Sequence, residues 1–234
     1  MKTTLLMPTL NEVEGLRAIM PRVRPEWVDQ ILVADGGSTD GTLEYARAAG
    51  YDVFVQQRPG IRQAYTEALP RVRGDVVITF SPDGNSIPEL IPALIAKMRE
   101  GYDMVIVSRY APGAKSEDDD WITAFGNAMF TWLINRLHGA HYTDAMVIYR
   151  AWRKELYGLL DLDKDESFRT EERLFCTRVG IEPLLSVRAA KRRLRCAEIP
   201  GDEPPRVGGV RKLQVVRWGC AYLYEVVREK FVWR

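Results

Sequence analysis

The sequence of 234 residues predicts an α/β fold in which a mostly parallel sheet is covered by helices on both faces. Short apolar runs rich in β-branched residues, such as residues 76–80 (Val-Val-Ile-Thr-Phe), are typical of strands buried on both faces. Stretches with helical periodicity separate these runs, and this alternation is typical of a parallel sheet. The composition, with 46% hydrophobic and 28% charged residues, fits a globular protein with a sizeable core.

The first half of the chain is predicted to alternate regularly between strands and helices. Strands are expected at residues 3–7, 31–34, 52–55, 76–80 and 104–107. Helices are expected at residues 12–23, 40–49, 61–69 and 88–100. Pro8 is expected to end the first strand, whereas Pro88 suits the first turn of a helix.

The second half is less regular and contains two polar loops, at residues 111–120 and 200–209. Helices are expected at residues 121–137, 168–179 and 213–231, and strands at residues 146–149 and 182–187. We therefore expect a single domain over residues 1–234. Residues 1–110 would form its first half, residues 111–210 a smaller second region, and residues 211–234 an amphipathic C-terminal helix.

The overall charge is nearly balanced, because 33 Lys and Arg residues face 32 Asp and Glu residues. Net charge therefore gives no argument for a nucleic-acid partner, and none is expected. Basic residues are concentrated after residue 188, which indicates either an anionic partner such as phosphate or lipid, or a solvated helical face. The three cysteines form no metal motif, and no signal peptide or membrane-spanning run is visible, so we expect a cytoplasmic protein.

Polar turns follow four of the predicted strands. They lie at residues 8–12 (Pro-Thr-Leu-Asn-Glu), 35–42 (Asp-Gly-Gly-Ser-Thr-Asp-Gly-Thr), 81–85 (Ser-Pro-Asp-Gly-Asn) and 108–110 (Ser-Arg-Tyr). In a parallel sheet all four turns emerge at the carboxyl edge, where they can converge on one ligand. Several of these turns could also be helix N-caps, but four polar turns at one edge favour a ligand site.

The turn at residues 81–85 is the candidate metal site. Asp83 and Asn85 offer two side-chain oxygens, and oxygen ligands suit hard cations such as Mg²⁺ and Mn²⁺. Taken alone, the segment would rather be an ordinary turn, because Pro, Asp, Gly and Asn are all turn formers. The neighbouring polar turns shift the interpretation toward a cation site.

The turns at residues 8–12 and 35–42 together resemble the opening of family 2 glycosyltransferases, which have the GT-A (Rossmann-like) fold. Within this family the chain is most similar to the dolichyl/polyprenyl-phosphate mannosyltransferase type, and the resemblance covers nearly the whole chain. Residues 81–89 resemble the family's Asp-Ala-Asp-x-Gln-x-Pro-Pro-Glu segment, and residues 108–110 match its Ser-Arg-Tyr. Residues 206–213 resemble its Arg-x-x-Gly-x-Ser-Lys-Leu.

The resemblance implies an inverting transfer of a sugar from a GDP- or UDP-sugar to a polyprenyl phosphate, with Mg²⁺ or Mn²⁺ as cofactor. Residues 1–110 would bind the nucleotide sugar, and residues 111–210 would form the acceptor side. The implied nucleotide-binding residues are Pro8, Asn11, Glu12, Asp35, Gly36 and Asp83, with Asp35 holding the base or ribose. Asp83 and Asn85 would bind the metal ion. The implied contacts to sugar or phosphate groups are Arg109, Arg206 and Lys212, and basic side chains suit a diphosphate leaving group.

Three positions depart from the family pattern. Ser81 stands in place of the first metal-site acid, so the site has one carboxylate fewer. Ala124 stands where the subtype carries a second arginine, and residues 147–150 (Val-Ile-Tyr-Arg) stand where the family has Ser-Gly-Phe-Arg. We therefore expect weaker and more nucleotide-dependent metal binding than a site with two acids would give, and the acceptor stays open.

Two classes of acceptor are compatible with the sequence. A hydroxyl acceptor, on a glycan or a small molecule, would need a base, and Asp144 is the candidate, although a cap or loop hydrogen bond explains this residue equally well. A phosphate acceptor is already an anion and would need only positive charge from Arg206, Arg211 and Lys212. The aromatic, basic last helix could then contact the inner face of a membrane peripherally, although core packing accounts for its aromatic residues slightly better.

Two further classes of function have weaker support. A nucleotidyltransferase usually has a Gly-rich, basic loop after its first strand, which residues 8–12 do not provide. A non-catalytic sugar-nucleotide binder is compatible with the missing acid at Ser81. Donor binding without turnover would favour this second class.

Overall fold

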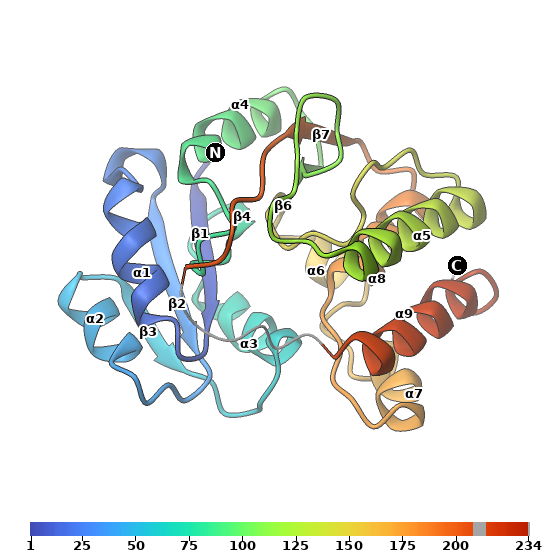
Figure 1. Cartoon of the computed structure of the whole chain (residues 1–234), viewed down its shortest axis with the longest axis horizontal. Helices are drawn as coiled ribbons and strands as arrows, with labels where there is room; N and C mark the ends of the chain where they lie inside the picture. The colour runs from blue at the N-terminus through green and yellow to red at the C-terminus, as the bar shows by residue number, and fades with distance from the viewer. Residues whose placement is uncertain (208–213, 234) are drawn as a thin grey trace.

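The computed structural model describes residues 1–207 and 214–233, and its strands form one seven-stranded sheet (Figure 1). The strand order is β3-β2-β1-β4-β6-β5-β7. The strands are β1 (Thr3–Thr9), β2 (Gln30–Asp35), β3 (Asp52–Val55), β4 (Val76–Thr79), β5 (Met104–Ser108), β6 (Arg150–Arg153) and β7 (Cys196–Pro200). All neighbouring pairs are parallel except those of β6, which runs antiparallel between β4 and β5.

Helices cover both faces of this sheet, as the sequence predicts. They are α1 (Val13–Ile19), α2 (Thr42–Ala48), α3 (Ile61–Ala68), α4 (Ile91–Arg99), α5 (Trp121–His138), α6 (Leu156–Leu159), α7 (Glu166–Leu174), α8 (Glu182–Lys191) and α9 (Val215–Glu229). Short 3₁₀ turns lie at Met20–Arg22, Pro25–Trp27, Leu69–Arg71 and Pro88–Leu90. The described residues include no helix that combines the length and the apolar character needed to cross a membrane.

The core has two layers because successive strand residues point to opposite faces of the sheet. Leu5 and Met7 of β1 pack with apolar residues of α1, α2 and α4, whereas Leu6 between them belongs to the layer formed with α3, α5, α8 and α9. All three side chains are fully buried. This explains why the strands read as continuous apolar runs and not as alternating ones.

Two predicted strands are wrong. Residues 146–149 are not a strand, and the strand of this region is β6, which begins at Arg150. Residues 182–187 belong to α8, whose side chains Leu184, Leu185 and Val187 are all fully buried. A helix that is buried on all sides shows no amphipathic period, so its apolar run resembles a buried strand.

Two smaller corrections concern the end of β1 and a strand that was not predicted. β1 continues through Pro8 to Thr9, because Pro8 faces the side on which β4 has already ended. Its missing N–H therefore breaks no ladder hydrogen bond. β7 was not predicted as a strand; it pairs in parallel with β5 at the edge of the sheet.

The topology decides where the polar turns meet. β1, β2, β4 and β5 all run in the same direction, so the turns that follow them lie at one edge of the sheet. Because β6 is antiparallel to β4 and β5, its N-terminal end lies at this edge, and the residues just before β6 lie there too. This arrangement brings residues 146–149 to the site.

A buried network of charges joins α9 to α7 and α8. Arg188 Nε lies 3.0 Å from Glu229 Oε2, and Arg228 contacts both Glu171 and Glu229. Glu225 is fully buried beside them. Burial, followed by the nearby Glu171 carboxylate, raises the pKa of Glu225 well above its ordinary value.

Replacing Glu225 by Gln is therefore expected to stabilise the protein at neutral and alkaline pH. The unfolded chain loses the Glu225 proton near pH 4.5, whereas the folded protein keeps it to higher pH, so the wild-type protein loses stability as pH rises through this window. The variant should gain about 1–3 kcal/mol in free energy of unfolding at pH 8, and almost nothing at pH 4.5. Urea titrations of variant and wild type at both pH values measure the gain in free energy of unfolding. A gain at pH 8 that is no larger than the gain at pH 4.5 would contradict the prediction.

Candidate active site

A large cavity opens at the carboxyl edge of the sheet. Its volume is about 890 Å³, which is the size of a small-molecule site. Pro8 lines it from the end of β1, and Gly36 and Asp83 line it from the turns after β2 and β4. Residues 146–149 and the first turns of α9 line the opposite side.

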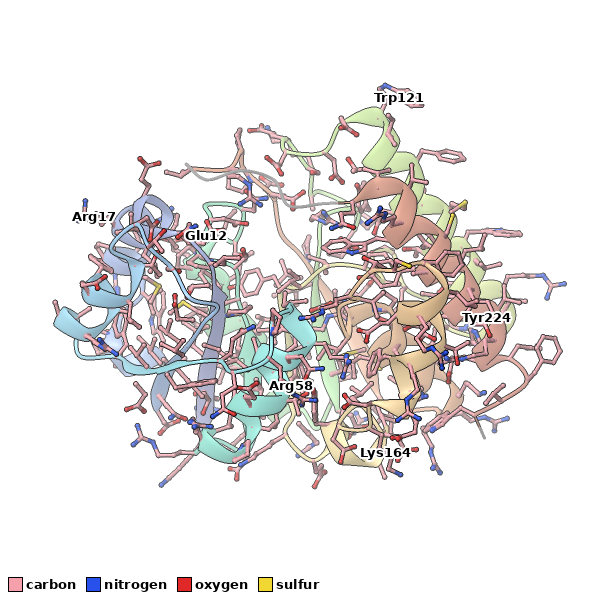
Figure 2. All side chains as sticks on the ribbon, turned by 90° about the horizontal axis from the view of Figure 1, so that it is seen from below. Glu12, Arg17, Arg58, Trp121, Lys164 and Tyr224 are labelled. Carbon is pink, nitrogen blue, oxygen red and sulfur yellow. The ribbon has the colours of Figure 1, made fainter. Side chains whose placement is uncertain are left out.

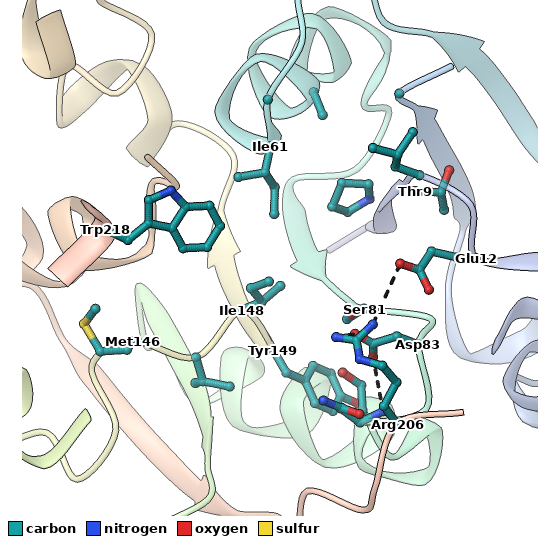
Figure 3. A pocket seen from close by; sticks show the side chains of 18 of the residues that line it. Thr9, Glu12, Ile61, Ser81, Asp83, Met146, Ile148, Tyr149, Arg206 and Trp218 are labelled. Atoms are coloured by element: carbon teal, nitrogen blue, oxygen red, sulfur yellow. Dashed lines mark hydrogen bonds and ion pairs between the residues drawn. The ribbon is translucent and has the colours of Figure 1, made fainter. Parts of the chain in front are cut away.

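Arg206 lies among acidic groups on one wall of this cavity (Figure 3). Its Nη2 atom is 2.8 Å from Asp83 Oδ2, and its Nη1 atom is 3.9 Å from Glu12 Oε1. Its backbone N–H also donates to Asp118 Oδ1 at 3.3 Å. The guanidinium therefore supplies the positive charge at the place where the sequence predicts a bound cation.

The turn at residues 81–85 is held against the segment that carries Arg206. The Val207 N–H donates to the Asp83 carbonyl at 2.7 Å. Gly84 has a φ of 103°, and a side chain at this position would lie only 2.7 Å from the Val207 backbone nitrogen. Glycine at position 84 is therefore needed both for the left-handed backbone and for the close approach of the two segments.

Asp83 and Asn85 fit a divalent cation by the chemistry of their donor atoms. Asn85 Oδ1 is buried and has no hydrogen-bond partner in the part of the chain that the structure describes, while Asn85 Nδ2 donates to Asp118 Oδ2 at 3.0 Å. An orphaned buried oxygen beside a carboxylate suits a hard cation. Among the described residues, no group of three His, Cys, Asp or Glu side chains could hold a metal ion. A cation here would need further ligands from a bound diphosphate or from water.

The two polar loops predicted from the sequence are joined to each other beside the cavity. The Glu117 N–H donates to the Glu203 carbonyl at 2.8 Å, and the Glu203 N–H donates to the Lys115 carbonyl at 2.9 Å. The Ser116 hydroxyl also donates to the Glu203 carboxylate. Asp118 and Arg206 thus reach the same wall from distant parts of the sequence.

Arg109 lies at the centre of a second charged cluster. It binds both carboxylate oxygens of Asp144, with Nε at 2.7 Å and Nη2 at 3.2 Å, and its Nη1 is 3.1 Å from both oxygens of Glu203. Burial alone would lower the pKa of Arg109, but Asp144, Glu203 and Asp119 raise it above its ordinary value. Arg109 and Glu203 both line the cavity, so the cluster places a guanidinium together with carboxylates at its edge.

Asp144, the candidate base, is fully buried, and both of its carboxylate oxygens face Arg109. It does not line the cavity. Its backbone N–H and that of Thr143 donate to Glu198, which fixes this loop beside β7. This placement favours a role in positioning Arg109 over a role in accepting a proton from an acceptor.

Replacing Asp144 by Asn should consequently destabilise the fold. The change removes one charge of a largely buried ion pair, and we expect it to cost about 3–5 kcal/mol in free energy of unfolding. Urea unfolding monitored by circular dichroism measures this cost. A variant with wild-type stability and no transfer activity would instead support Asp144 as the base.

Of the predicted residues, Asn11 ties the turn after β1 to the turn after β2, and Asp35 orders the second turn from the end of β2. Asn11, with a φ of 56°, accepts from the Thr39 N–H at 2.9 Å, and its own N–H donates to the Ser38 hydroxyl at 2.8 Å. Asp35 is fully buried and accepts from the N–H groups of Gly37 and Ser38 at 2.9 and 2.8 Å. Neither Asn11 nor Asp35 lines the cavity, whereas Pro8, Glu12 and Gly36 do.

The wall opposite Arg206 is apolar. Ile61, Met146, Ile148 and Trp218 line it and point toward the cavity (Figure 3). Arg150 orders this segment from behind, because its fully buried guanidinium donates to the carbonyls of Ala145 and Val147. The cavity thus has a charged wall around Arg206 and an apolar wall around Trp218, while Glu172 and Arg178 also line it.

Several of these residues were not among the candidates from the sequence. Asp118, Glu203 and Trp218 line the cavity but carry no local signal of function. Asp118 is hidden in a run of three aspartates, and Trp218 reads as one aromatic residue of an amphipathic helix. Arg211 and Lys212, candidates for phosphate contacts, lie outside the described residues.

A family model and two relatives from other organisms all match this chain to glycosyltransferases. The model of the family described as "Glycosyl transferase family 2" matches residues 4–157. The chain is 32% identical to an undecaprenyl-phosphate mannosyltransferase of Micrococcus luteus, over 98% of this chain and 99% of that protein. It is 31% identical to the glycosyltransferase AglJ of Haloferax volcanii, over 96% of this chain and 70% of that protein.

Solved structures share the same fold at lower sequence identity. Mannosyl-3-phosphoglycerate synthase of Rubrobacter xylanophilus superposes with a TM-score of 0.69 at 19% identity, over 97% of this chain and 73% of that one. Glucosyl-3-phosphoglycerate synthase of Mycobacterium tuberculosis, in a complex with Mn²⁺ and UDP-glucose, gives a TM-score of 0.61 at 22% identity, over 96% of this chain and 78% of that one.

Proposed function

Since this chain belongs to glycosyl transferase family 2, we propose that it transfers a sugar, with inversion, from a GDP- or UDP-sugar to a polyprenyl phosphate. The observation that carries the proposal is the cavity with two unlike walls, one charged and one apolar. A nucleoside diphosphate bound through a divalent cation suits the charged wall, where carboxylates outnumber guanidinium groups. The first isoprene units of a lipid phosphate suit the apolar wall. The undecaprenyl-phosphate mannosyltransferase relative supports this acceptor class.

In this proposal the turns after β1, β2 and β4 hold the donor. Pro8 and Gly36 line the nucleotide side, and Asn11 and Asp35 shape the two turns by hydrogen bonds. Asp83 and Asn85 would hold Mg²⁺ or Mn²⁺, which neutralises charge on a departing diphosphate when bound. The complex of glucosyl-3-phosphoglycerate synthase with Mn²⁺ and UDP-glucose supports a donor of this kind.

The acceptor side is proposed to work without a base. A phosphate acceptor is already an anion, and Arg109, Arg206 and Lys212 would supply the positive charge that orients it. Asp144 would hold Arg109 in place through its two short contacts. The alternative acceptor, a glycan or small-molecule hydroxyl, would require Asp144 to leave Arg109 and become exposed. A polyprenyl phosphate is embedded in a bilayer, so the enzyme would work at the membrane surface on the cytoplasmic side.

A two-stage assay tests the proposal. In the first stage, UDP-, GDP- and dTDP-sugars are screened by thermal shift with Mg²⁺ or Mn²⁺, and one donor should raise the melting temperature more than the others. In the second stage, that donor is incubated with a short-chain isoprenyl phosphate, with the corresponding isoprenol, and with free glycans. Transfer to the phosphate alone is expected. Transfer to a hydroxyl acceptor would support the alternative, and donor binding without any turnover would support a non-catalytic binder.

A further inference from the structure

Two neighbouring helices of the protein carry an outward-facing apolar stripe. On α5, Trp121, Phe125 and Trp132 are 78%, 65% and 64% exposed. Their spacing of four and seven residues places them on one face of the helix. On α9, the exposed apolar side chains are Val215, Val216, Leu223 and Val227, and Phe231 and Val232 continue the row just beyond the helix.

The two helices lie side by side and run in the same direction (Figure 1). Phe130 packs edge-on against Tyr222 with ring centroids 6.3 Å apart. Further along both helices, the His138 ring contacts the Val226 carbonyl at 2.9 Å, and Lys230 Nζ donates to the Leu137 carbonyl at 3.0 Å. The exposed sides of α5 and α9 are therefore neighbours, and we call them together the α5/α9 face.

The charges of the two helices are sorted by sign. α5 contains no acidic residue, and the two acidic residues of α9, Glu225 and Glu229, are fully buried. The exposed charged residues on or directly after these helices are Arg136, Arg217 and Lys230, and the exposed acid next to them is Asp120, the N-cap directly before Trp121. A helix face that meets water usually mixes both signs with few large apolar groups, whereas a face that is apolar and cationic is typical of the membrane interface.

The α5/α9 face also leads to the cavity. Trp218, in the first turns of α9, lines the apolar wall of the cavity. Because the helices are parallel, the first turn of α5 lies at the same end, and Trp121 there points away from the body of the molecule (Figure 2). A surface that contacts the α5/α9 face would therefore lie beside the apolar entrance to the cavity.

We propose that the α5/α9 face docks on a bilayer that contains anionic lipids. Trp121, Phe125 and Trp132 would enter the interfacial region, and Arg136, Arg217 and Lys230 would contact lipid phosphates. The inference extends the expected contact of the C-terminal helix to a two-helix surface with a defined orientation. The role of this docking rests on the proposed function, because in this orientation the apolar wall of the cavity would face an acceptor held in the bilayer.

Vesicle binding tests the docking surface independently of catalysis. The full chain is mixed with vesicles of phosphatidylglycerol and phosphatidylcholine that contain no polyprenyl phosphate, and the bound fraction is measured by sedimentation. The double substitution Phe125→Glu and Trp132→Glu should lower the partition coefficient at least ~10-fold. Leu159→Glu is the matched control, because Leu159 is an exposed apolar residue on α6, outside the face, and it should change binding less than about twofold.

Two further measurements use only the wild-type protein, so they do not depend on whether the variant folds. In the wild-type protein, tryptophan fluorescence should shift to the blue on vesicles and should be quenched by lipids brominated near the headgroup. Binding should weaken with added salt and should be much weaker on pure phosphatidylcholine vesicles. Equal binding of the wild type and the double variant, or no fluorescence change on anionic vesicles, would overturn the proposal.

The remaining outcomes separate this inference from the proposed function. The double variant should still transfer sugar to a soluble short-chain isoprenyl phosphate at the wild-type rate, because the substituted residues do not line the cavity. Vesicle binding without transfer to any lipid phosphate would contradict the proposed function but leave the docking surface intact. The wild-type protein could also fail to bind vesicles and instead form dimers that the double substitution dissociates. That result would show that a second copy covers this face, and it would overturn the inference.

Discussion

Replacing Asp83 by Asn is expected to reduce sugar transfer by at least about 10³-fold, because Asp83 is the only carboxylate in the candidate metal-binding turn. The substitution keeps the shape of the side chain but removes its negative charge. The site would then offer a cation only neutral oxygens and could no longer hold it against the diphosphate. Transfer of a radiolabelled sugar to a short-chain isoprenyl phosphate, at saturating Mn²⁺ or Mg²⁺, measures the loss.

Asp52→Asn is the matched control for this variant. Asp52 also pairs with an arginine, Arg73, but at the exposed start of β3 and away from the cavity. Its substitution should leave transfer within about threefold of wild type, as is usual for surface ion pairs. If Asp83→Asn retained transfer within tenfold of wild type while folded, the assignment of the metal site to this turn would fail.

Replacing Arg206 by Gln should have two opposite effects. The first is tighter binding of Mn²⁺ in the absence of nucleotide, by about 3–10-fold, because the guanidinium 2.8 Å from Asp83 competes with a cation for the same carboxylate. The second is a loss of transfer of about 10²–10³-fold, because a positive group that stabilises the leaving diphosphate is removed. Isothermal titration calorimetry with Mn²⁺ alone measures the first effect, and kcat/KM measures the second.

Arg22→Gln provides the comparison for Arg206. Arg22 forms a 2.7 Å ion pair with Glu89 on the surface, and both side chains are about half exposed. Neither metal affinity nor transfer should change in this variant. Metal binding that weakens in Arg206→Gln would contradict the idea that Arg206 occupies the place of the cation, and would point to a structural role in holding the turn at 81–85.

The first five strands could be predicted because their signals are local. Residues 52–55 and 76–80 combine β-branched apolar residues with turn formers at the ends, and the observed strands β3 and β4 coincide with them or end one residue earlier. The prediction fails at residues 146–153 and 182–191, where neighbours decide the structure. β6 exists because β4 and β5 offer it partners on both sides, and α8 is surrounded by core on every side.

The candidate site shows the same division. Pro8, Glu12, Gly36, Asp83 and Asn85 could be placed at one edge because a parallel sheet delivers the ends of its strands together. Asp118, Glu203 and Trp218 could not be found in this way, because they come from loops and a helix whose positions depend on the packing of the second half. The ion pair between Asp144 and Arg109 also joins distant segments, and it favours a positioning role for Asp144 over the predicted role of a base.

The α/β class, the family resemblance and the edge of the sheet at which the candidate site lies follow from the sequence alone. These properties depend on residue periodicity and on short motifs, which are local in the sequence. The pairing of Arg206 with Asp83, the apolar side chains opposite them and the neighbouring exposed sides of α5 and α9 appear only in the folded chain. Those relations arise from contacts between segments far apart in the chain, and they follow from how the helices and loops pack against the sheet.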